Sequence, residues 1–206
     1  MDLKLIYGNM RALCEAPQMM LHYADIPYEY KMVWDHYGSS WAEVKKDIIF
    51  NRLPILIINE DKYLWQSNTI IRYLSNLTKT KPSDEFQLAY CDAVFESTHE
   101  MFSPLNPTIN MTFGEKYNSN KKKLLEDILP NSLNNFEKLL QNSSGNFFIG
   151  NDPFYCDFNA YHHFSMCLIL DKNIFSNFPN LKKFINNFEK LNNCLLYTSD
   201  AADEDL

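Results

Sequence analysis

The chain has 206 residues, of which 46% are hydrophobic and 22% charged, and its formal net charge is −7 at pH 7. This length fits one large domain or two small ones, and the composition is too apolar for a disordered chain. The negative charge argues against a protein that binds nucleic acid through phosphate contacts. No apolar run approaches the roughly 18 residues that a membrane span needs, and the N-terminus alternates like a strand rather than a signal peptide.

Five cysteines are irregularly spaced, and none lies in a Cys-x-x-Cys pair: Cys14, Cys91, Cys156, Cys167 and Cys194. We expect reduced thiols in a cytosolic protein, most of them in the core. A zinc site is not expected, because no cysteine or histidine cluster has ligand spacing. The adjacent His162 and His163 would point about 100° apart on a helix.

The segment from Cys194 to Glu204 resembles the translation of a transposase-type sequencing adapter. The preceding residues are rich in Asn, Lys and Phe, whereas the tail turns to Ala and Asp. We therefore expect 194–206 to be an artefactual tail and the natural chain to differ beyond about Asn193. Four acids of the tail supply more than half of the net charge: Asp200, Asp203, Glu204 and Asp205.

Residues 1–77 have the pattern of a mixed α/β domain. Leu3–Tyr7 alternates like a strand, and the helix that Ser67 opens carries apolar residues at helical spacing. The predicted order is a strand (3–7), a helix (10–24), a strand (28–33), a short helical or irregular segment (41–49), a strand (55–58), a turn (59–62), a return strand (63–65) and a helix (67–77).

A polar linker at 78–83 separates this part from a second domain, predicted at 84–193. No convincing strand follows the linker, and the predicted helices are 86–102, 122–140, 157–170 and 181–191. The charge run Lys121–Lys123 is expected to be a solvated helix start. The fold class is therefore an α/β domain followed by an all-α domain.

Two short motifs carry the chemistry of the first domain. Pro54 precedes a run that must be a buried strand, which suits a strand's first residue. A cis Leu53-Pro54 bond there would turn the backbone of Leu53 outward, to pair with an extended peptide. Gln66-Ser67 precedes a helix, where Ser67 is a good N-cap and the free N–H groups suit a carboxylate. The alternative is that Ser67 only caps its helix.

Together these motifs resemble the glutathione transferases, in which a thioredoxin-like domain precedes an all-helical domain. The similarity is strongest to the sigma class, which includes the glutathione-dependent prostaglandin D synthases, and it spans the chain to about Asn193. The residues that carry it are Leu5 to Arg11 with Glu15, Asp25 to Glu29, Trp41 with Lys45, Leu53-Pro54, Gln66-Ser67, Ile70, Arg72 to Leu74, Gly150 and Asp157-Phe158.

The resemblance places Tyr7 where the family's catalytic tyrosine hydrogen-bonds the glutathione sulfur. A phenol that donates to the sulfur favours the thiolate, which is the nucleophile. Lowering the thiol pKa by two units needs about 2.7 kcal/mol, within reach of one or two charge-assisted hydrogen bonds. The alternative is that Tyr7, one of 12 tyrosines, simply ends a strand.

The resemblance also implies how glutathione is held. Gln66 and Ser67 would bind the γ-glutamyl carboxylate, and Leu53, ahead of Pro54, would pair its backbone with the cysteinyl unit. No metal is implied.

Further residues of this chain match the family's charged and aromatic contacts. Trp41, Lys45 and Arg52 would lie at the glycyl carboxylate, although the two cations are alternatively plain surface charges. Glu100 falls where the sigma class places an acid that reaches the partner subunit's glutathione, but a solvated helix-face carboxylate explains it nearly as well. Phe50 falls where related classes insert an aromatic side chain into the partner, and a local core role is the alternative.

Two departures from the family pattern affect these expectations. The sigma class reads Arg-Gly-Arg-Ala-Glu after the tyrosine, whereas this chain has Leu13 at the second arginine, which removes a positive charge near the sulfur. A Ser or Thr cap precedes the helix near Asp157 in the family, and Phe154 stands there instead. Asp152-Pro153 would then start that helix two residues early.

The resemblance implies a cytoplasmic, homodimeric detoxification enzyme that conjugates glutathione to small hydrophobic electrophiles, with isomerase or peroxidase activity as further options. One rival is a non-catalytic carrier of hydrophobic ligands on the same fold, which Leu13 favours slightly. A second is a crystallin-like structural protein, against which intact Tyr7, Gln66 and Ser67 count. A thiol-disulfide oxidoreductase fits less well, because Cys14 lies well inside the predicted first helix.

Overall fold

The computed structural model describes residues 1–191, so the adapter-like tail with Cys194 lies outside the described residues. The chain divides into two compact units, one from Met1 to Lys81 and one that begins at Pro82. The first unit is mixed α/β and the described part of the second is helical, which confirms the predicted fold class. Within residues 1–191, no helix is both long enough and apolar enough to cross a membrane.

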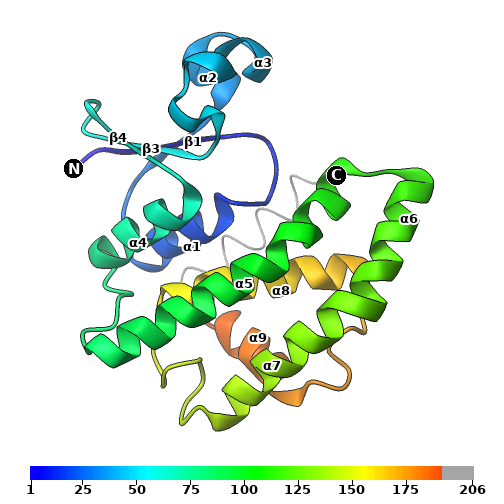
Figure 1. The fold of residues 1–206 in the computed structure, drawn as a ribbon. Helices are drawn as coiled ribbons and strands as arrows, with labels where there is room; N and C mark the ends of the chain where they lie inside the picture. The colour runs from blue at the N-terminus through cyan, green and yellow to red at the C-terminus, as the bar shows by residue number, and fades with distance from the viewer. Residues whose placement is uncertain (192–206) are drawn as a thin grey trace. The chain divides into compact units, whose positions relative to one another are not determined.

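The first unit is built on a four-stranded sheet in the order β2-β1-β3-β4 (Figure 1). Strand β1 pairs in parallel with β2 and antiparallel with β3, and β3 pairs antiparallel with β4. The elements are β1 (Leu3–Tyr7), α1 (Glu15–Tyr23), β2 (Glu29–Met32), α2 (Val33–Tyr37), α3 (Trp41–Val44), the 3-10 turns Lys45–Asp47 and Ile49–Asn51, β3 (Ile55–Ile58), β4 (Lys62–Trp65) and α4 (Ser67–Leu77).

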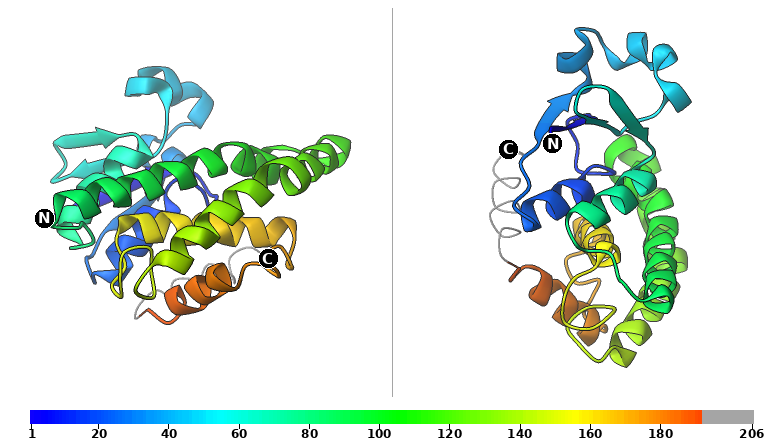
Figure 2. Two further views of the ribbon diagram at one scale, coloured as in Figure 1. Left: turned by 60° about the horizontal axis from the view of Figure 1, so that its bottom comes forward. Right: turned by 90° about the vertical axis from the view of Figure 1, so that its left-hand side faces the viewer.

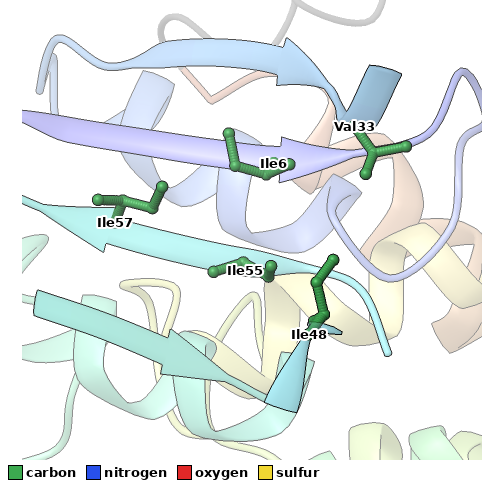
Figure 3. Close-up of a cluster of buried hydrophobic side chains, with 5 residues drawn as sticks. All are labelled: Ile6, Val33, Ile48, Ile55 and Ile57. Carbon is green, nitrogen blue, oxygen red and sulfur yellow. The ribbon is translucent and has the colours of Figure 1, made fainter. Parts of the chain in front are cut away.

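The sheet separates two layers of this unit. Helices α1 and α4 pack against each other on one face, and α2 and α3 lie on the other, as Figure 2 also shows. Strand β3 is buried along its whole length, because both of its faces are covered. The α2 side is filled by an isoleucine-rich cluster, drawn in Figure 3: Ile6, Val33, Ile48, Ile55 and Ile57.

The first helix is shorter than predicted. The apolar spacing indicated a helix over 10–24, but α1 begins at Glu15 and residues 9–14 form bends and turns. The second difference is α2, which the sequence did not predict. It takes Val33, the expected last residue of the second strand, and ends at Tyr37, after which Gly38 caps it with a left-handed φ of 66°.

The second unit packs its helices around α8 (Tyr155–Leu170), which is almost wholly buried. Its long neighbour is α5 (Glu85–Met111), and α9 (Pro179–Phe188) packs on α7 and α8 (Figure 1). Aromatic rings in mutual contact fill much of this core: Phe136, Phe148, Phe158, Phe164, Phe184 and Phe188.

Helix ends that the sequence predicted near prolines in this unit were wrong. The expected helix 86–102 continues through Pro104 and Pro107 to Met111, because the packing of α5 on α8 outweighs the missing N–H donors. The expected helix 122–140 is one helical run of α6 (Gly114–Lys123), a π turn (Leu124–Ile128) and α7 (Leu129–Asn142). The π turn ends at Ile128, two residues before Pro130.

Two local expectations in this unit were wrong. Lys121–Lys123 lies in the last turn of α6 rather than at a helix start, where positive charge suits the helix dipole. Helix α8 begins at Tyr155 and not near Asp152-Pro153, because Asp157 fixes its start. The Asp157 carboxylate accepts the backbone N–H groups of Phe154 and Phe148, at 2.8 and 3.0 Å.

A polar network lies inside this core, between α5 and α8. Asn159 Nδ2 donates to Thr98 Oγ1 at 2.7 Å, and His163 Nδ1 lies 3.0 Å from the carbonyl oxygen of Thr98. Burial lowers the pKa of His163 well below its usual value, and the neighbouring His162 and His99 lower it further. His163 is therefore neutral in the folded protein.

We predict that His163 lowers the free energy of unfolding as the pH drops below about 6.5. The unfolded chain then protonates His163 while the folded chain does not, so this residue costs up to about 1.4 kcal/mol per pH unit. Burial raises the pKa of Asp157 to about 7, which contributes a slope of the opposite sign, so each variant is compared with wild type. In denaturant unfolding at pH 7, 6 and 5, the slope of stability against pH should be less positive in His163→Gln than in wild type, whereas His36→Gln, at a half-exposed site, should change the slope far less. An unchanged slope in His163→Gln would contradict the prediction.

Candidate functional site

Tyr7 ends the central strand with its side chain buried, at 7% exposure. The backbone N–H of Leu13 donates to the Tyr7 hydroxyl oxygen at 3.3 Å. Burial raises the pKa of Tyr7 to about 12, the Leu13 N–H opposes this, and the nearby Cys14 adds to it. The phenol is thus protonated at neutral pH, with its oxygen already accepting one hydrogen bond.

The loop from Gly8 to Leu13 returns the chain to Tyr7. Within this loop, Arg11 Nε lies 2.7 Å from Glu15 Oε1, and Glu15 is buried in the first turn of α1. The Arg11 charge is therefore compensated by a buried carboxylate. Leu13 stands where the sigma-class pattern has its second arginine, so that cation is absent. The backbone N–H of Leu13 is the polar group of this residue that reaches the Tyr7 phenol.

The peptide bond between Leu53 and Pro54 is cis, as the sequence suggested. It leads directly into β3, and Pro54 is buried while Leu53 is half-buried. Leu53 packs on the isoleucine-rich cluster of Figure 3, and Trp41, Val44 and Trp65 pack on the same cluster. The structure thus brings Trp41 and Leu53 together around one apolar centre, although 12 residues separate them.

Helix α4 has the predicted bounds of 67–77, but its N-cap residue differs from the prediction. Gln66 and not Ser67 is the N-cap residue, and Ser67 is the first residue of the helix. Only one residue separates β4 from α4, so Gln66 makes the turn, with φ 70° and ψ 117°. Ser67 Oγ lies 3.4 Å from Asn68 Oδ1 rather than capping the helix. The first N–H groups of α4 remain a place for an anion.

The remaining candidates are not gathered at one place by the described structure. Lys45 opens the first 3-10 turn and Arg52 directly follows the second. Both side chains are exposed, and within residues 1–191 neither forms an ion pair. Glu100 is exposed on α5 and belongs to the second unit. Phe50 is 59% exposed, which excludes the alternative of a local core aromatic.

Two tyrosines beside Tyr7 were not identified from the sequence. The Tyr30 hydroxyl donates to the carbonyl oxygen of Gly8 at 2.8 Å. The Tyr28 hydroxyl lies within 3.1 Å of Gln18 and His22 on α1. The signal available was alternation, since residues 28 and 30 of the predicted strand 28–33 would face the same side.

The donor chemistry of the described residues gives no metal centre. In the part of the chain that the structure describes, no group of three or more His, Cys, Asp or Glu residues is placed to hold a metal ion. Cys14, Cys91, Cys156 and Cys167 are free, buried thiols, as expected. Burial raises the pKa of the Cys14 thiol, so it is a poor nucleophile.

Comparison with known proteins identifies the family. Residues 1–76 match the family model for the glutathione S-transferase N-terminal domain, and residues 99–200 match that for the C-terminal domain. The chain belongs to the glutathione S-transferase family. It is thus a transferase of the kind that uses glutathione as co-substrate.

Similar curated proteins span most of the chain. A Glutathione S-transferase P of Caenorhabditis elegans is 28% identical over 98% of this chain and 94% of its own length. A Glutathione S-transferase of Plasmodium yoelii yoelii is 30% identical over 81% of this chain and 78% of its own. The human Glutathione S-transferase Mu 3 is 28% identical, with coverages of 93% and 85%.

Solved structures support the fold. The Pi-class Glutathione S-transferase of Onchocerca volvulus has a TM-score of 0.87 at 24% identity, covering 100% of this chain and 96% of that chain. Rat hPGDS complexed with a quinoline has a TM-score of 0.85 at 24% identity, covering 97% of each chain. At this level of identity the likeness concerns the fold.

We predict that Gln66→Gly raises the free energy of unfolding by about 1 kcal/mol. The backbone of Gln66 has a positive φ that glycine adopts without strain. Gln66→Ala is the matched control, because it removes the side chain and keeps the strain, and it should unfold at a lower urea concentration than the glycine variant. A glycine variant less stable than the alanine variant would contradict the assignment of strain.

Proposed function

We propose that this chain is a sigma-like glutathione transferase in which Tyr7 stabilises the glutathione thiolate, which then attacks small hydrophobic electrophiles. The observation that carries the proposal is the Tyr7 hydroxyl: it is buried and protonated at neutral pH, and its oxygen accepts the Leu13 N–H. A hydrogen bond accepted by the oxygen makes the O–H a stronger donor to a sulfur. Isomerase or peroxidase activity would use the same thiolate.

The glutathione contacts follow from the same unit. Leu53, beside the cis bond to Pro54, offers backbone groups to the cysteinyl part of the peptide. Gln66 and Ser67, at the N-terminus of α4, hold the γ-glutamyl carboxylate, since the first N–H groups of a helix carry partial positive charge.

The proposed contacts to the glycyl carboxylate and the amino group of glutathione are charged or aromatic side chains. Lys45 and Arg52 are exposed cations without ion pairs among the described residues, available for the glycyl carboxylate next to Trp41. Glu100 reaches the amino group of glutathione bound in the partner subunit. The proposal includes domain boundaries at 1–77 and 84–193, an artefactual tail at 194–206, and a cytoplasmic homodimer.

A non-catalytic carrier remains the second candidate, because a specific observation favours it. Leu13 removes a cation that the sigma pattern places near the sulfur, so less positive charge faces a thiolate. A crystallin-like structural protein has the same fold but does not need a protonated, hydrogen-bonded Tyr7. Thiolate formation separates the enzyme from both.

We predict that wild-type protein binds glutathione as a thiolate near pH 7 and that Tyr7→Phe does not. Removing the phenol O–H takes away a hydrogen bond to the charged sulfur, which should raise the bound thiol's pKa by about two units. Thiolate absorbance in the ultraviolet across about pH 5–9 measures this. Tyr63→Phe, at an exposed tyrosine of β4, is the control. Glutathione bound without thiolate in the wild type would favour the carrier.

We predict that Phe50→Ala weakens the homodimer by at least tenfold in dissociation constant. Phe50 is 59% exposed at a positive φ of 64°, which fits a side chain that a partner subunit covers. Ile49→Ala, at a neighbouring residue that is 52% exposed, is the matched control. Sedimentation equilibrium gives both constants. Equal dissociation constants for Phe50→Ala and wild type would refute this role.

A further inference from the structure

The loop that returns to Tyr7 is fixed at its beginning by a residue of the neighbouring strand. The Tyr30 hydroxyl donates to the carbonyl oxygen of Gly8, directly after Tyr7, at 2.8 Å. We propose that Tyr30 is a positioning residue that sets the strength of the Tyr7 hydroxyl as a hydrogen-bond donor. This inference rests on the function proposed above.

The register of the sheet makes the contact possible. Leu5 pairs with Tyr30, and Tyr7 pairs with Met32, in the parallel ladder of β1 and β2. Alternation along each strand then places Leu5, Tyr7 and Tyr30 on the same face. The phenol of Tyr30 therefore extends along the face of Tyr7 and reaches the first peptide beyond β1.

The loop itself has little regular structure to hold it. Residues 9–12 are bends, and the first local backbone hydrogen bond near its end runs from Glu15 N to the Ala12 carbonyl oxygen, at 3.2 Å. Two side-chain hydroxyls connect the loop to the sheet. Tyr30 holds its beginning at Gly8, and Tyr7 holds its end by accepting the Leu13 N–H at 3.3 Å.

The hydrogen bond from Tyr30 to Gly8 affects the Tyr7 phenol through the second hydrogen bond, the one that Leu13 donates. The Gly8 carbonyl fixes the direction in which the chain leaves β1, and that direction decides whether the Leu13 N–H meets the phenol oxygen. The Leu13 N–H opposes the rise that burial causes in the Tyr7 pKa. Without the Tyr30 hydroxyl, the loop should loosen, the Leu13 contact should lengthen, and Tyr7 should become a weaker donor.

Tyr28 provides a matched comparison within the same strand region. It lies two residues before Tyr30, is also partly buried, and its hydroxyl is also hydrogen-bonded. Its partners are side chains of α1, Gln18 and His22, rather than the backbone of the loop. Tyr28→Phe thus removes the same group from the same face without releasing Gly8.

The experiment is a pH titration of the bound glutathione thiolate in wild type, Tyr30→Phe, Tyr28→Phe and Tyr7→Phe, with steady-state kinetics. In Tyr30→Phe we expect the apparent pKa of the bound thiol to rise by about one unit, which is a tenfold lower ratio of thiolate to thiol at the same pH. Its kcat should fall while its KM for glutathione stays close to that of wild type. Tyr28→Phe should titrate like wild type.

Amide hydrogen exchange gives a readout that does not depend on activity. The Leu13 N–H should exchange several-fold faster in Tyr30→Phe than in wild type or in Tyr28→Phe. Circular dichroism confirms that each variant is folded.

The outcomes separate this inference from the function on which it rests. If Tyr7→Phe loses the thiolate but Tyr30→Phe titrates like wild type, Tyr30 has no positioning role and the proposed function stands. If Tyr28→Phe shifts the titration as much as Tyr30→Phe, the effect is general loosening and the inference fails. If Tyr7→Phe keeps the thiolate, the proposed function fails first.

Discussion

The pairing of β1 on both of its edges is the constraint on which the first unit depends. Because β2 lies parallel to it on one side and β3 antiparallel on the other, β1 is held in a single register. Register in turn decides which side chains share a face. Tyr7, Leu5 and Tyr30 face one layer, while Ile6 and its isoleucine neighbours fill the other. Of the residues proposed to act on glutathione, Tyr7 ends this strand and Leu53-Pro54 lead directly into its neighbour β3.

Several polar groups that the fold buries have specific partners, and examples occur in both units. Glu15 has Arg11 at 2.7 Å, Asp157 accepts the N–H groups of Phe148 and Phe154, and the Thr98 carbonyl lies 3.0 Å from His163. An unmatched buried polar group costs roughly 1–3 kcal/mol, so each partner fixes the local backbone as well as stabilising it. The Tyr7 hydroxyl is matched in the same way, because its oxygen accepts the backbone N–H of Leu13.

Short-range patterns predicted much of the fold and part of the candidate site. Alternation of apolar and polar residues predicted β1 at Leu3–Tyr7, because that pattern is typical of a strand with one buried face. The continuous apolar run predicted β3 at Ile55–Ile58, because that pattern is typical of a strand buried on both faces. The proline at the head of β3 indicated the cis bond. The early start expected for α1 and the helix end expected at Phe102 were wrong, since a loop anchored on Tyr7 and the packing of α5 on α8 outweighed local propensity.

The sequence by itself determined the order of the strands, the two-part division into α/β and helical halves, and the residue types that carry the family resemblance. These features follow from the periodicity and the chemistry of residues that are close together in the sequence. Only the tertiary structure decided that Gln66 makes the turn before α4, that Asp157 starts α8, and that Tyr30 reaches Gly8. The Tyr30–Gly8 hydrogen bond joins residues 22 apart, one on β2 and one directly after β1, so no short window of the sequence contains both partners. Asp157 and Phe154 are close in sequence, but the same carboxylate also accepts the N–H of Phe148, and the angles of Gln66 follow from the single residue that joins β4 to α4.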